Sequence, residues 1–316
     1  MRVFHSVAEV PADFGPSVVS IGNFDGVHVG HGEIMRRVVA IGRERSLTPT
    51  VLTFDPHPAR VLAPARAPKL ICTIGQRVRR LESQGIEAAL LIPFSLEFAK
   101  LTPEQFAHDI LAGALKARVV LVGEDFRFGV KQSGDIGTLR TLGEALDFEL
   151  QPVGAIEGNG ARVSSTRIRE LVVAGKVSRA CRLMGAPFAL EGAVVSGRGI
   201  GSKMTVPTLN LASENELLPK TGVYVTLTRD LGTGREWQSI TNVGYRPTFN
   251  GSGLTVETFL LNGAPDETPA RIEVAFLTFV RDEMKFETPE LLKARIIRDA
   301  AAAKRFHARF ASLRVG

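Results

Sequence analysis

The chain has 316 residues, of which 44% are hydrophobic and 23% are charged, and its formal net charge is +6 at pH 7. This composition excludes an intrinsically disordered protein, and no apolar run approaches the length of a membrane span. The length allows two domains with separate cores, and the positive charge suits anionic ligands, whether these are nucleotides or nucleic acid.

In the first half of the chain, from residue 17 to about residue 153, apolar β-type runs alternate with helical patterns. This alternation predicts an α/β domain with a doubly wound parallel sheet, in which ligands bind at the carboxyl ends of the strands. Polar motifs that follow the strands are therefore the candidate binding sites. The expected strands are Val18–Ile21, Val51–Phe54, Ala88–Ile92, Val119–Val122 and Phe148–Val153.

The first strand leads into the motif Ile-Gly-Asn-Phe-Asp-Gly-Val-His-Val-Gly-His at residues 21–31. Its glycines allow tight turns and close backbone approach to a ligand, and the spacing that follows predicts an amphipathic helix. A strand, a glycine turn and a helix N-terminus together form an anion site. One histidine in such a place is usually a cap or a packed polar residue. Because His28 and His31 lie three residues apart, both rings can face the same bound group, which favours a phosphate site.

Two further motifs follow expected strands. The prolines of Thr-Phe-Asp-Pro-His-Pro, residues 53–58, fix an extended loop that holds Phe54 and His57 at the edge of the sheet. A rigid turn with a surface histidine is the alternative. The motif Gly-Glu-Asp-Phe-Arg-Phe-Gly, residues 123–129, carries Phe126 and Phe128. If these two rings are exposed in the loop, they favour the binding of a flat ligand such as an isoalloxazine or adenine ring. The alternative is that they pack together in a small satellite core.

Two helix starts are also informative. A capping box at Thr102–Gln105, with a proline in the first turn, predicts a helix that continues through Ala114. Residues 163–169, Val-Ser-Ser-Thr-Arg-Ile-Arg, open another helix. One hydroxyl is enough for a cap, whereas three of them followed by Arg167 and Arg169 also suit the β- and γ-phosphates of ATP, because arginine makes bidentate contacts to oxygens.

In the second half, short strands follow one another without helices between them, which predicts a small antiparallel barrel. A closing helix begins near residue 288 and presents an apolar face for core packing. The glycine-rich loop at residues 197–203 is neither a P-loop nor a dinucleotide fingerprint. Glu257, in mid-strand, either faces solvent or works in a site. The expected strands are Gly192–Ser196, Thr208–Leu211, Val223–Thr228, Ser239–Val243, Leu254–Leu261 and Ile272–Val280.

These motifs, taken in order along nearly the whole chain, resemble those of a known family. The His-x-Gly-His at residues 28–31 resembles the signature of the nucleotidyltransferase superfamily. Together with the motifs at 53–58, 123–129, 164–169 and Val-Pro-Thr-Leu-Asn at 206–210, it resembles the bacterial bifunctional riboflavin kinase/FMN adenylyltransferases. The resemblance implies a Rossmann-like nucleotidyltransferase domain over residues 1–185 and a flavokinase barrel with a terminal helix over residues 186–316.

The resemblance also implies roles for individual residues, with ATP, riboflavin, FMN and FAD as substrates and products. The catalytic residues it implies are Glu257 as the base of the kinase, and His28, His31 and Arg167 at the transferred phosphates. The residues it places at ATP are Gly22, Asn23, Phe24, Asp25, Gly26, Ser164, Ser165, Thr166, Gly197, Gly199, Gly201 and Lys203. Those it places at the flavin are Phe54, His57, Pro58, Asp125, Phe126 and Phe128. Those it places at Mg²⁺ are Thr208 and Asn210.

The chain departs from the family pattern at Gln132, Ser202, Thr205 and Phe259, where a basic residue, an arginine, a glycine and a histidine are usual. Three alternatives stay open: a nucleotidyltransferase with a barrel that only binds flavin, a flavin-responsive regulator, and a nucleic-acid-binding protein. The last lacks the interleaved aromatic and basic residues of a stacking platform. We expect a cytoplasmic protein, because its two cysteines show no metal or redox spacing. We expect no nucleic-acid or membrane partner, and a monomer or weak homo-oligomer.

Overall fold

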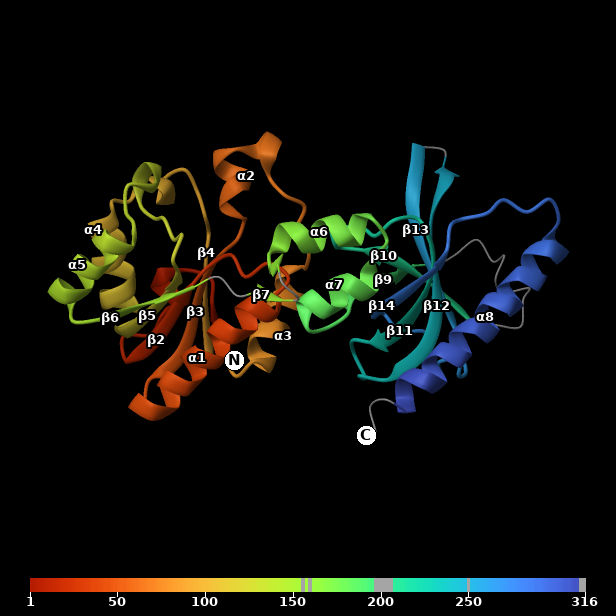
Figure 1. The fold of residues 1–316 in the computed structure, drawn as a ribbon, viewed down its shortest axis with the longest axis horizontal. Helices are drawn as coiled ribbons and strands as arrows, with labels where there is room; N and C mark the ends of the chain where they lie inside the picture. Colours follow the sequence, from red (N-terminus) through yellow and green to blue (C-terminus); the bar gives the residue numbers. More distant parts are fainter. Residues whose placement is uncertain (155–156, 159–160, 196–206, 249–250, 313–316) are drawn as a thin grey trace. The chain divides into compact units, whose positions relative to one another are not determined.

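The computed structural model describes the chain except residues 155–156, 159–160, 196–206, 249–250 and 313–316 (Figure 1). The chain forms two compact units. The sheet unit comprises Met1–Lys69 and Thr73–Ser165, and the barrel unit comprises Leu70–Cys72 and Thr166–Gly316. The expected domain boundary between residues 185 and 186 stays a prediction. Within the described residues, no helix is long and apolar enough to cross a membrane.

The sheet unit contains six parallel strands in the order β1-β4-β3-β2-β5-β6. All five expected strands are present, and the predicted parallel α/β fold is confirmed. The short edge strand β1 was not expected. The strands are β1 (Arg2–Phe4), β2 (Ser17–Ile21), β3 (Thr48–Phe54), β4 (Ala88–Ile92), β5 (Ala117–Gly123) and β6 (Glu149–Val153).

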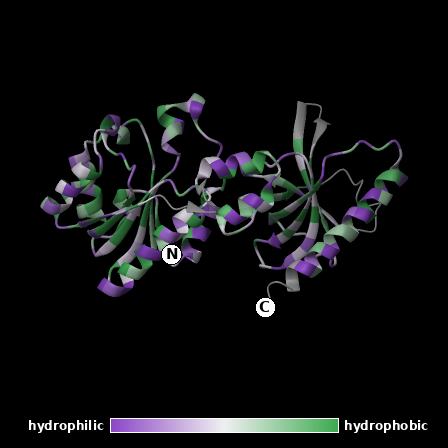
Figure 2. Cartoon of the chain, in the orientation of Figure 1, coloured by the Kyte–Doolittle hydropathy of each residue, from purple (hydrophilic) through white to green (hydrophobic). Residues whose placement is uncertain are grey.

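Helices cover both faces of this sheet, because successive strand residues point to opposite sides. On one face, Val18 of β2 packs with Met35 of α1 and Leu81 of α3. On the other, Val19 packs with Ile110 of the helix labelled η4 and with Leu139 of α5. In Figure 2 these helices carry both hydrophilic and hydrophobic colours, as amphipathic helices do. The helices are α1 (Val29–Arg45), α2 (Pro58–Leu62), α3 (Ile74–Ser83), α4 (Pro103–Gln105), η4 (Phe106–Ala114) and α5 (Ile136–Leu146), with short turns η1 (Val7–Glu9), η2 (Pro64–Arg66), η3 (Phe98–Lys100) and η5 (Val130–Gln132) and the small pair β7 (Glu157–Gly158) and β8 (Ala161–Arg162).

The predicted capping box is present at the start of α4. The Thr102 hydroxyl accepts from the Gln105 amide at 3.2 Å, and the Thr102 amide donates to Gln105 Oε1 at 2.9 Å. The helix then continues to Ala114 with the wider turns of a π-helix, and the Leu115 amide bonds five residues back to the Ile110 carbonyl at 2.9 Å. Apolar spacing identifies a helix here but does not distinguish its hydrogen-bond pattern.

The order of the strands fixes where a ligand should bind. After β2, the strands β3 and β4 are added toward one edge of the sheet, and β5 and β6 are then added toward the opposite edge, so the direction of growth reverses between β2 and β5. In an open parallel sheet, the crevice outside the carboxyl ends of the strands at this reversal is the binding position. The motifs after β2 and β5, at residues 22–28 and 124–129, are therefore neighbours in space.

The barrel unit is built on a closed barrel in which β10-β13-β12-β11-β14-β9 pair antiparallel around the ring. This confirms the predicted barrel. Helices α6 and α7 contribute Ile168, Leu171 and Val177 to its core cluster. The elements are α6 (Ser165–Val173), α7 (Val177–Met184), β9 (Phe188–Val195), β10 (Thr208–Ser213), β11 (Gly222–Asp230), β12 (Glu236–Thr248), β13 (Gly251–Leu260), β14 (Arg271–Arg281) and α8 (Pro289–Ser312).

The closing helix α8 packs on the outside of the barrel, where Ala303 is fully buried and Phe306 contacts Val225 and its neighbours. Residues Leu292 and Ile296 of the expected apolar face are half-buried, and the side chain of Phe310 lies outside the described residues. Phe259, where the family pattern has histidine, packs against the same cluster. An apolar ring at this position therefore has a packing role.

Five buried hydroxyls inside the barrel form a closed ring of hydrogen bonds. Going round, Thr226 contacts Ser239 at 2.8 Å, Ser239 contacts Thr228 at 2.8 Å, Thr228 contacts Thr258 at 3.0 Å, Thr258 contacts Thr241 at 2.9 Å, and Thr241 returns to Thr226 at 2.7 Å. All five side chains are fully buried. Each hydroxyl can donate once and accept once, so the ring satisfies polar groups that would otherwise be costly to bury.

Candidate active sites

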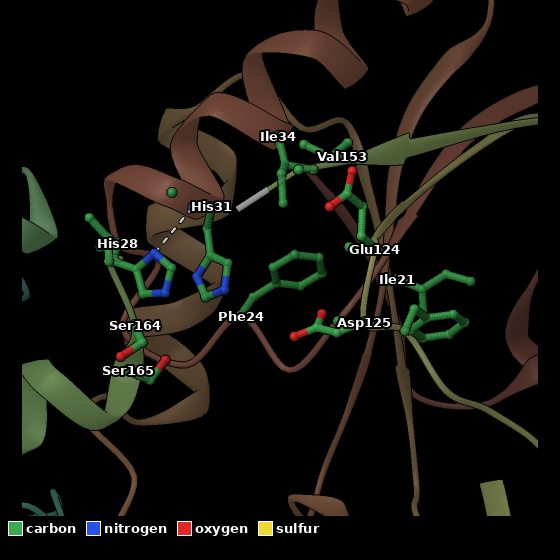
Figure 3. Close-up of a pocket in the computed structure, with 16 residues that line it drawn as sticks. Ile21, Phe24, His28, His31, Ile34, Glu124, Asp125, Val153, Ser164 and Ser165 are labelled. Carbon is green, nitrogen blue, oxygen red and sulfur yellow. Dashed lines mark hydrogen bonds between the residues drawn. The ribbon is translucent and has the colours of Figure 1, made fainter. Parts of the chain in front are cut away.

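The sheet unit has a cavity of about 380 Å³ at the carboxyl ends of β2 and β5, the position that the strand order predicts (Figure 3). Three separate motifs of the sequence line it. The loop after β2 contributes Gly22, Phe24 and His28, and the first turn of α1 contributes His31. The loop after β5 contributes Glu124, Asp125 and Phe126, and the chain at the start of α6 contributes Ser164 and Ser165. The fold therefore brings together residues that lie up to about 140 positions apart in sequence, as in the Ser165–Asp25 bond.

His28 is the N-cap of α1. Its Nδ1 accepts a hydrogen bond from the His31 amide at 3.2 Å, the ordinary role of a polar residue at a helix start. Because Nδ1 accepts, a neutral His28 ring must carry its proton on Nε2, which leaves a donor on the other side of the ring. The His31 ring stacks on His28 with the centroids 3.6 Å apart and an angle of 11° (Figure 3).

Both imidazoles are neutral at pH 7. Burial lowers the pKa of His28 to about 4, although its own backbone and Asp25 act in the opposite direction. Burial also lowers the pKa of His31 well below 6.5, and the nearby His28 and Arg77 lower it further. Nδ1 of His31 is buried and has no hydrogen-bond partner among the described residues. A buried nitrogen without a partner is rare and is typical of a site that a ligand or water completes.

The loop after β2 is held by hydrogen bonds to its carbonyls. The Asn23 carbonyl accepts from Thr53 Oγ1 at 3.2 Å, the Asp25 carbonyl from Ser165 Oγ at 3.0 Å, and the Gly26 carbonyl from Arg80 Nη1 at 3.1 Å. Val27 has φ 39°, an uncommon conformation for a β-branched residue that persists only where the surroundings enforce it. The loop is therefore a preorganised structure.

Two side chains expected at ATP are buried. Asp25 is 1% exposed and Phe24 is 2% exposed. The Phe24 ring meets the edge of His31 with centroids 5.2 Å apart, so it packs beneath that imidazole at the wall of the cavity. Asn23 is exposed beside them.

The expected flavin residues divide into two groups. Phe126 is half-buried and lines the cavity with Asp125. Phe128, expected to be exposed, is only 7% exposed and stacks on Phe126 with centroids 5.5 Å apart. Phe128 also packs against Phe106 with ring centroids 5.6 Å apart, and both rings belong to the main core cluster of the sheet together with Val19. The expected contact of Phe128 with flavin stays a prediction.

The second group lies at the end of β3. Phe54 is half-buried and packs with Phe94 at 5.6 Å and Phe98 at 6.0 Å. His57 caps α2, with Nδ1 accepting from the Ala59 amide at 3.1 Å, and Pro58 is the first residue of that helix. Phe94 and Phe98 were missed by the sequence analysis, although they follow the expected strand β4 as the other motifs follow theirs.

The chain around the start of α6 belongs to both units. Ser164 and Ser165 line the cavity of the sheet unit, whereas Thr166 and Arg167 belong to the barrel unit. Arg167 is exposed and pairs with Glu170 at 3.1 Å. Its expected contact with phosphate stays a prediction.

A second cluster of expected residues lies on the barrel. Asn210 of β10 pairs in register with Glu257 of β13, which pairs in register with Asn242 of β12. Their neighbours Leu209 and Val256 pack in the barrel core, so these three polar side chains point outward. Side chains directly opposite on adjacent strands have Cβ atoms about 4.5–5.5 Å apart, and Thr208 lies two positions from Asn210 on the same face. The expected loop residues Gly197, Gly199, Gly201 and Lys203, with Ser202 and Thr205, lie outside the described residues.

Comparisons with known proteins match both halves of the chain. The sequence model of the FAD synthetase family matches residues 10–167, and that of the riboflavin kinase family matches residues 184–307. A protein of Escherichia coli strain K12 named bifunctional riboflavin kinase/FMN adenylyltransferase is 33% identical over 306 residues, 97% of each chain. A protein of the same name from Pseudomonas fluorescens is 33% identical over 288 residues, 91% of this chain and 92% of its own.

A solved structure has the same fold along almost the whole length. It is described as a macrolide-efflux protein from Streptococcus pneumoniae, with a TM-score of 0.84 and 28% identity over 96% of this chain and 98% of that chain. The sheet unit and the barrel unit thus each correspond to one of the two family models, and the relatives align from end to end. The chain therefore belongs to the bifunctional riboflavin kinase/FMN adenylyltransferase family.

Proposed function

We propose that the barrel unit phosphorylates riboflavin with ATP to give FMN, and that the sheet unit then transfers the adenylyl group of a second ATP to FMN, giving FAD and pyrophosphate. The observation that supports this most directly is the cavity at the carboxyl ends of β2 and β5, where an anion-binding turn, two neutral imidazoles and two serines converge. Family membership over both halves of the chain supports two activities.

In the adenylyl-transfer step, an oxygen of the FMN phosphate attacks the α-phosphorus of ATP, and the bond from that phosphorus to the oxygen bridging to the β-phosphorus breaks. No nucleophile of the enzyme is needed. The N–H groups at the start of α1 and the Nε2–H of His28 are donors placed where negative charge develops on the phosphates. Because His28 is neutral at pH 7, it contributes a hydrogen bond and no full charge. Ser164, Ser165, Thr166 and Arg167 are assigned to the same triphosphate.

The flavin of FMN is assigned to the aromatic side of this cavity. Phe126 offers a half-buried ring at the wall, held flat by Phe128 behind it. Asp125 is exposed beside it and can accept a hydrogen bond from a ring N–H. Phe54, His57 and Pro58, at the end of β3, are assigned to the same flavin, although they are not among the residues that line the cavity.

In the kinase step, we assign Glu257 as the base that accepts the proton of the riboflavin 5′-hydroxyl while the oxygen attacks the γ-phosphorus of ATP, releasing ADP. The Thr208 hydroxyl and the Asn210 amide oxygen fit Mg²⁺, which prefers oxygen ligands and few protein contacts. When bound, that ion neutralises phosphate charge. Asn242, in register with Glu257, is placed to orient the carboxylate or the hydroxyl.

Two substitutions test the assignment by separating the activities. His31→Ala should abolish FAD formation from FMN while riboflavin phosphorylation continues, and Glu257→Ala should do the reverse. The products formed from riboflavin, FMN and MgATP are resolved by chromatography. If either variant, still folded, loses both activities, the two-site assignment is wrong. If the unmodified chain makes no FMN from riboflavin, the proposed kinase step is wrong. The expected monomer or weak homo-oligomer stays a prediction, which sedimentation can check.

A further inference from the structure

Arg77 on α3 is a buried cation without a counter-ion. Its side chain is 1% exposed, and no carboxylate of the described residues forms an ion pair with it. Its Nη1 donates to the Phe54 carbonyl at 3.2 Å and to Thr53 Oγ1 at 3.4 Å, and its Nε has no partner in the described part of the chain. Charged side chains are almost never fully buried unless they are paired, so this arrangement requires a reason.

The position of Arg77 supplies one. Thr53 Oγ1, which accepts from Arg77, donates to the Asn23 carbonyl at 3.2 Å in the loop after β2. The guanidinium is thus linked to this loop through Thr53, and Arg77 is not among the residues that line the cavity. Its positive charge also reaches the ring of His31, where it is one of the causes of the lowered pKa. Arg80, one turn further along α3, donates to Gly26 of the same loop.

A purely structural clamp does not need this charge. A neutral amide side chain donates to a carbonyl and a hydroxyl equally well, without the cost of burying a cation. A buried positive charge is useful where an anion binds nearby, because charges act on one another more strongly away from water. Of the two anions that the proposed reaction brings to the cavity, the triphosphate of ATP and the phosphate of FMN, the triphosphate carries the larger negative charge.

We propose that Arg77 is a positioning residue for adenylyl transfer: it holds the loop after β2 through Thr53, and its fixed positive charge favours the ATP triphosphate in the cavity. The inference rests on the proposed function, which places ATP at His28 and His31. It assigns to Arg77 no contact with substrate.

Three variants separate the charge from the hydrogen bonds. Arg77→Lys keeps the charge, Arg77→Gln keeps a donor without the charge, and Arg77→Met removes both. For FMN adenylylation we expect the KM for ATP to rise about tenfold in the glutamine and methionine variants. The lysine variant should recover most of that loss, and the KM for FMN should change less than twofold in all three. Arg79→Met, an exposed position on the same helix, is the matched control and should leave both constants unchanged.

The riboflavin kinase activity of the same molecules, together with the unfolding temperature, reports whether each variant is folded. A glutamine variant with the ATP KM of the unmodified enzyme would overturn the inference, as would a lysine variant no better than methionine. Failure of all three variants to fold would overturn it too, since the residue would then be structural. His31→Ala distinguishes failure of the proposed function from failure of the inference about Arg77. If His31→Ala leaves adenylylation intact, the proposed site is wrong. If it abolishes adenylylation while Arg77→Met does not affect it, only the role of Arg77 is wrong.

Discussion

His28 has two separable roles, and two substitutions distinguish them. As the N-cap of α1 it accepts the His31 amide through Nδ1 at 3.2 Å, and as a proposed donor to phosphate it uses the Nε2–H. Asparagine retains an oxygen that can cap the helix but has no group at the position of Nε2. Alanine retains neither. The pair His28→Asn and His28→Ala therefore measures the cap and the donor separately.

The magnitudes follow from the geometry. Loss of a cap costs about 0.5–2 kcal/mol of stability, and a bond at the long end of the normal range, 3.2 Å, favours the lower part of that interval. Loss of one donor to a developing anion costs about 2.7–4 kcal/mol of barrier, which is about 10²–10³ in rate. His28→Asn should therefore retain the stability of the sheet unit and lose adenylylation by two to three orders of magnitude. His28→Ala should lose about 1 kcal/mol of stability as well.

The assay is the rate of FAD formation from FMN and MgATP, with riboflavin phosphorylation as an internal measure of active enzyme and urea unfolding as the measure of stability. The unmodified enzyme and both variants are compared at pH 7.5, where the imidazoles are neutral. If His28→Asn forms FAD within about threefold of the unmodified rate, His28 is only a cap, and the proposed mechanism loses its first donor.

Three further outcomes are expected. Acidification from pH 7 to pH 4 should destabilise the sheet unit, because the pKa of His28 is about 4 when folded and 6.5 when unfolded, so the unfolded chain takes up the proton first; the loss for this group approaches about 3 kcal/mol. His28→Asn should reduce the acid-induced shift of the urea midpoint, and an unchanged shift would contradict the reasoning. Thr241→Val should cost the barrel unit about 1–3 kcal/mol, because the removed hydroxyl leaves buried partners without hydrogen bonds; a urea midpoint equal to that of the unmodified chain would show that the ring does not stabilise the barrel. In Gly192→Ala the new Cβ would lie 1.9 Å from the Ala212 carbonyl oxygen, so the strands must separate at a cost of about 3 kcal/mol or more; kinase activity should fall while adenylylation persists. Gly232→Ala, whose nearest neighbour is at 3.4 Å, is its control, and equal losses in both variants would refute the argument.

The sheet of the first half was predictable because its signals agree. Each buried strand is a short apolar run, and the motifs that follow Ile21 and Val122 begin with the glycines that parallel α/β turns need. These signals together predict that the cavity lies at the carboxyl ends of the strands. The edge strand β1 was missed because three residues, Arg2–Phe4, carry too little pattern to identify.

The electrostatics of the site could not be predicted in the same way. Arg77 stands in the sequence Arg-Val-Arg-Arg at residues 77–80, where three arginines look equivalent, and only the packing of α3 shows that one of them is buried. Burial likewise decides that His28 and His31 are neutral. The stacking of Phe128 under Phe126 depends on a contact with Phe106, about twenty residues earlier in the chain, that no local pattern reveals.

The interior of the barrel reverses the usual interpretation of a strand. In β11, Val223 and Val225 alternate with Tyr224 and Thr226, and a half-exposed strand would place the threonine outside. Instead the valines pack on the outer cluster that includes Ala303 of α8, and the threonine lies in the ring of hydroxyls inside. Because α8 buries the outer surface, side chains on both faces of this strand are buried. The polarity of a residue in β11 therefore does not indicate whether its side chain points into the barrel or out of it.

The closed ring of hydroxyls has a direction of its own. Geometry permits either donor at four of its five contacts, but at the fifth only Thr241 can donate to Thr258. If every hydroxyl gives one proton and receives one, Thr258 must then donate to Thr228, Thr228 to Ser239, Ser239 to Thr226, and Thr226 back to Thr241. All five hydrogen bonds therefore run in the same direction around the ring, and each one polarises the next. Every hydroxyl proton is used within the ring. A protein can in this way enclose a cluster of polar groups in which every donor has an acceptor within the same cluster.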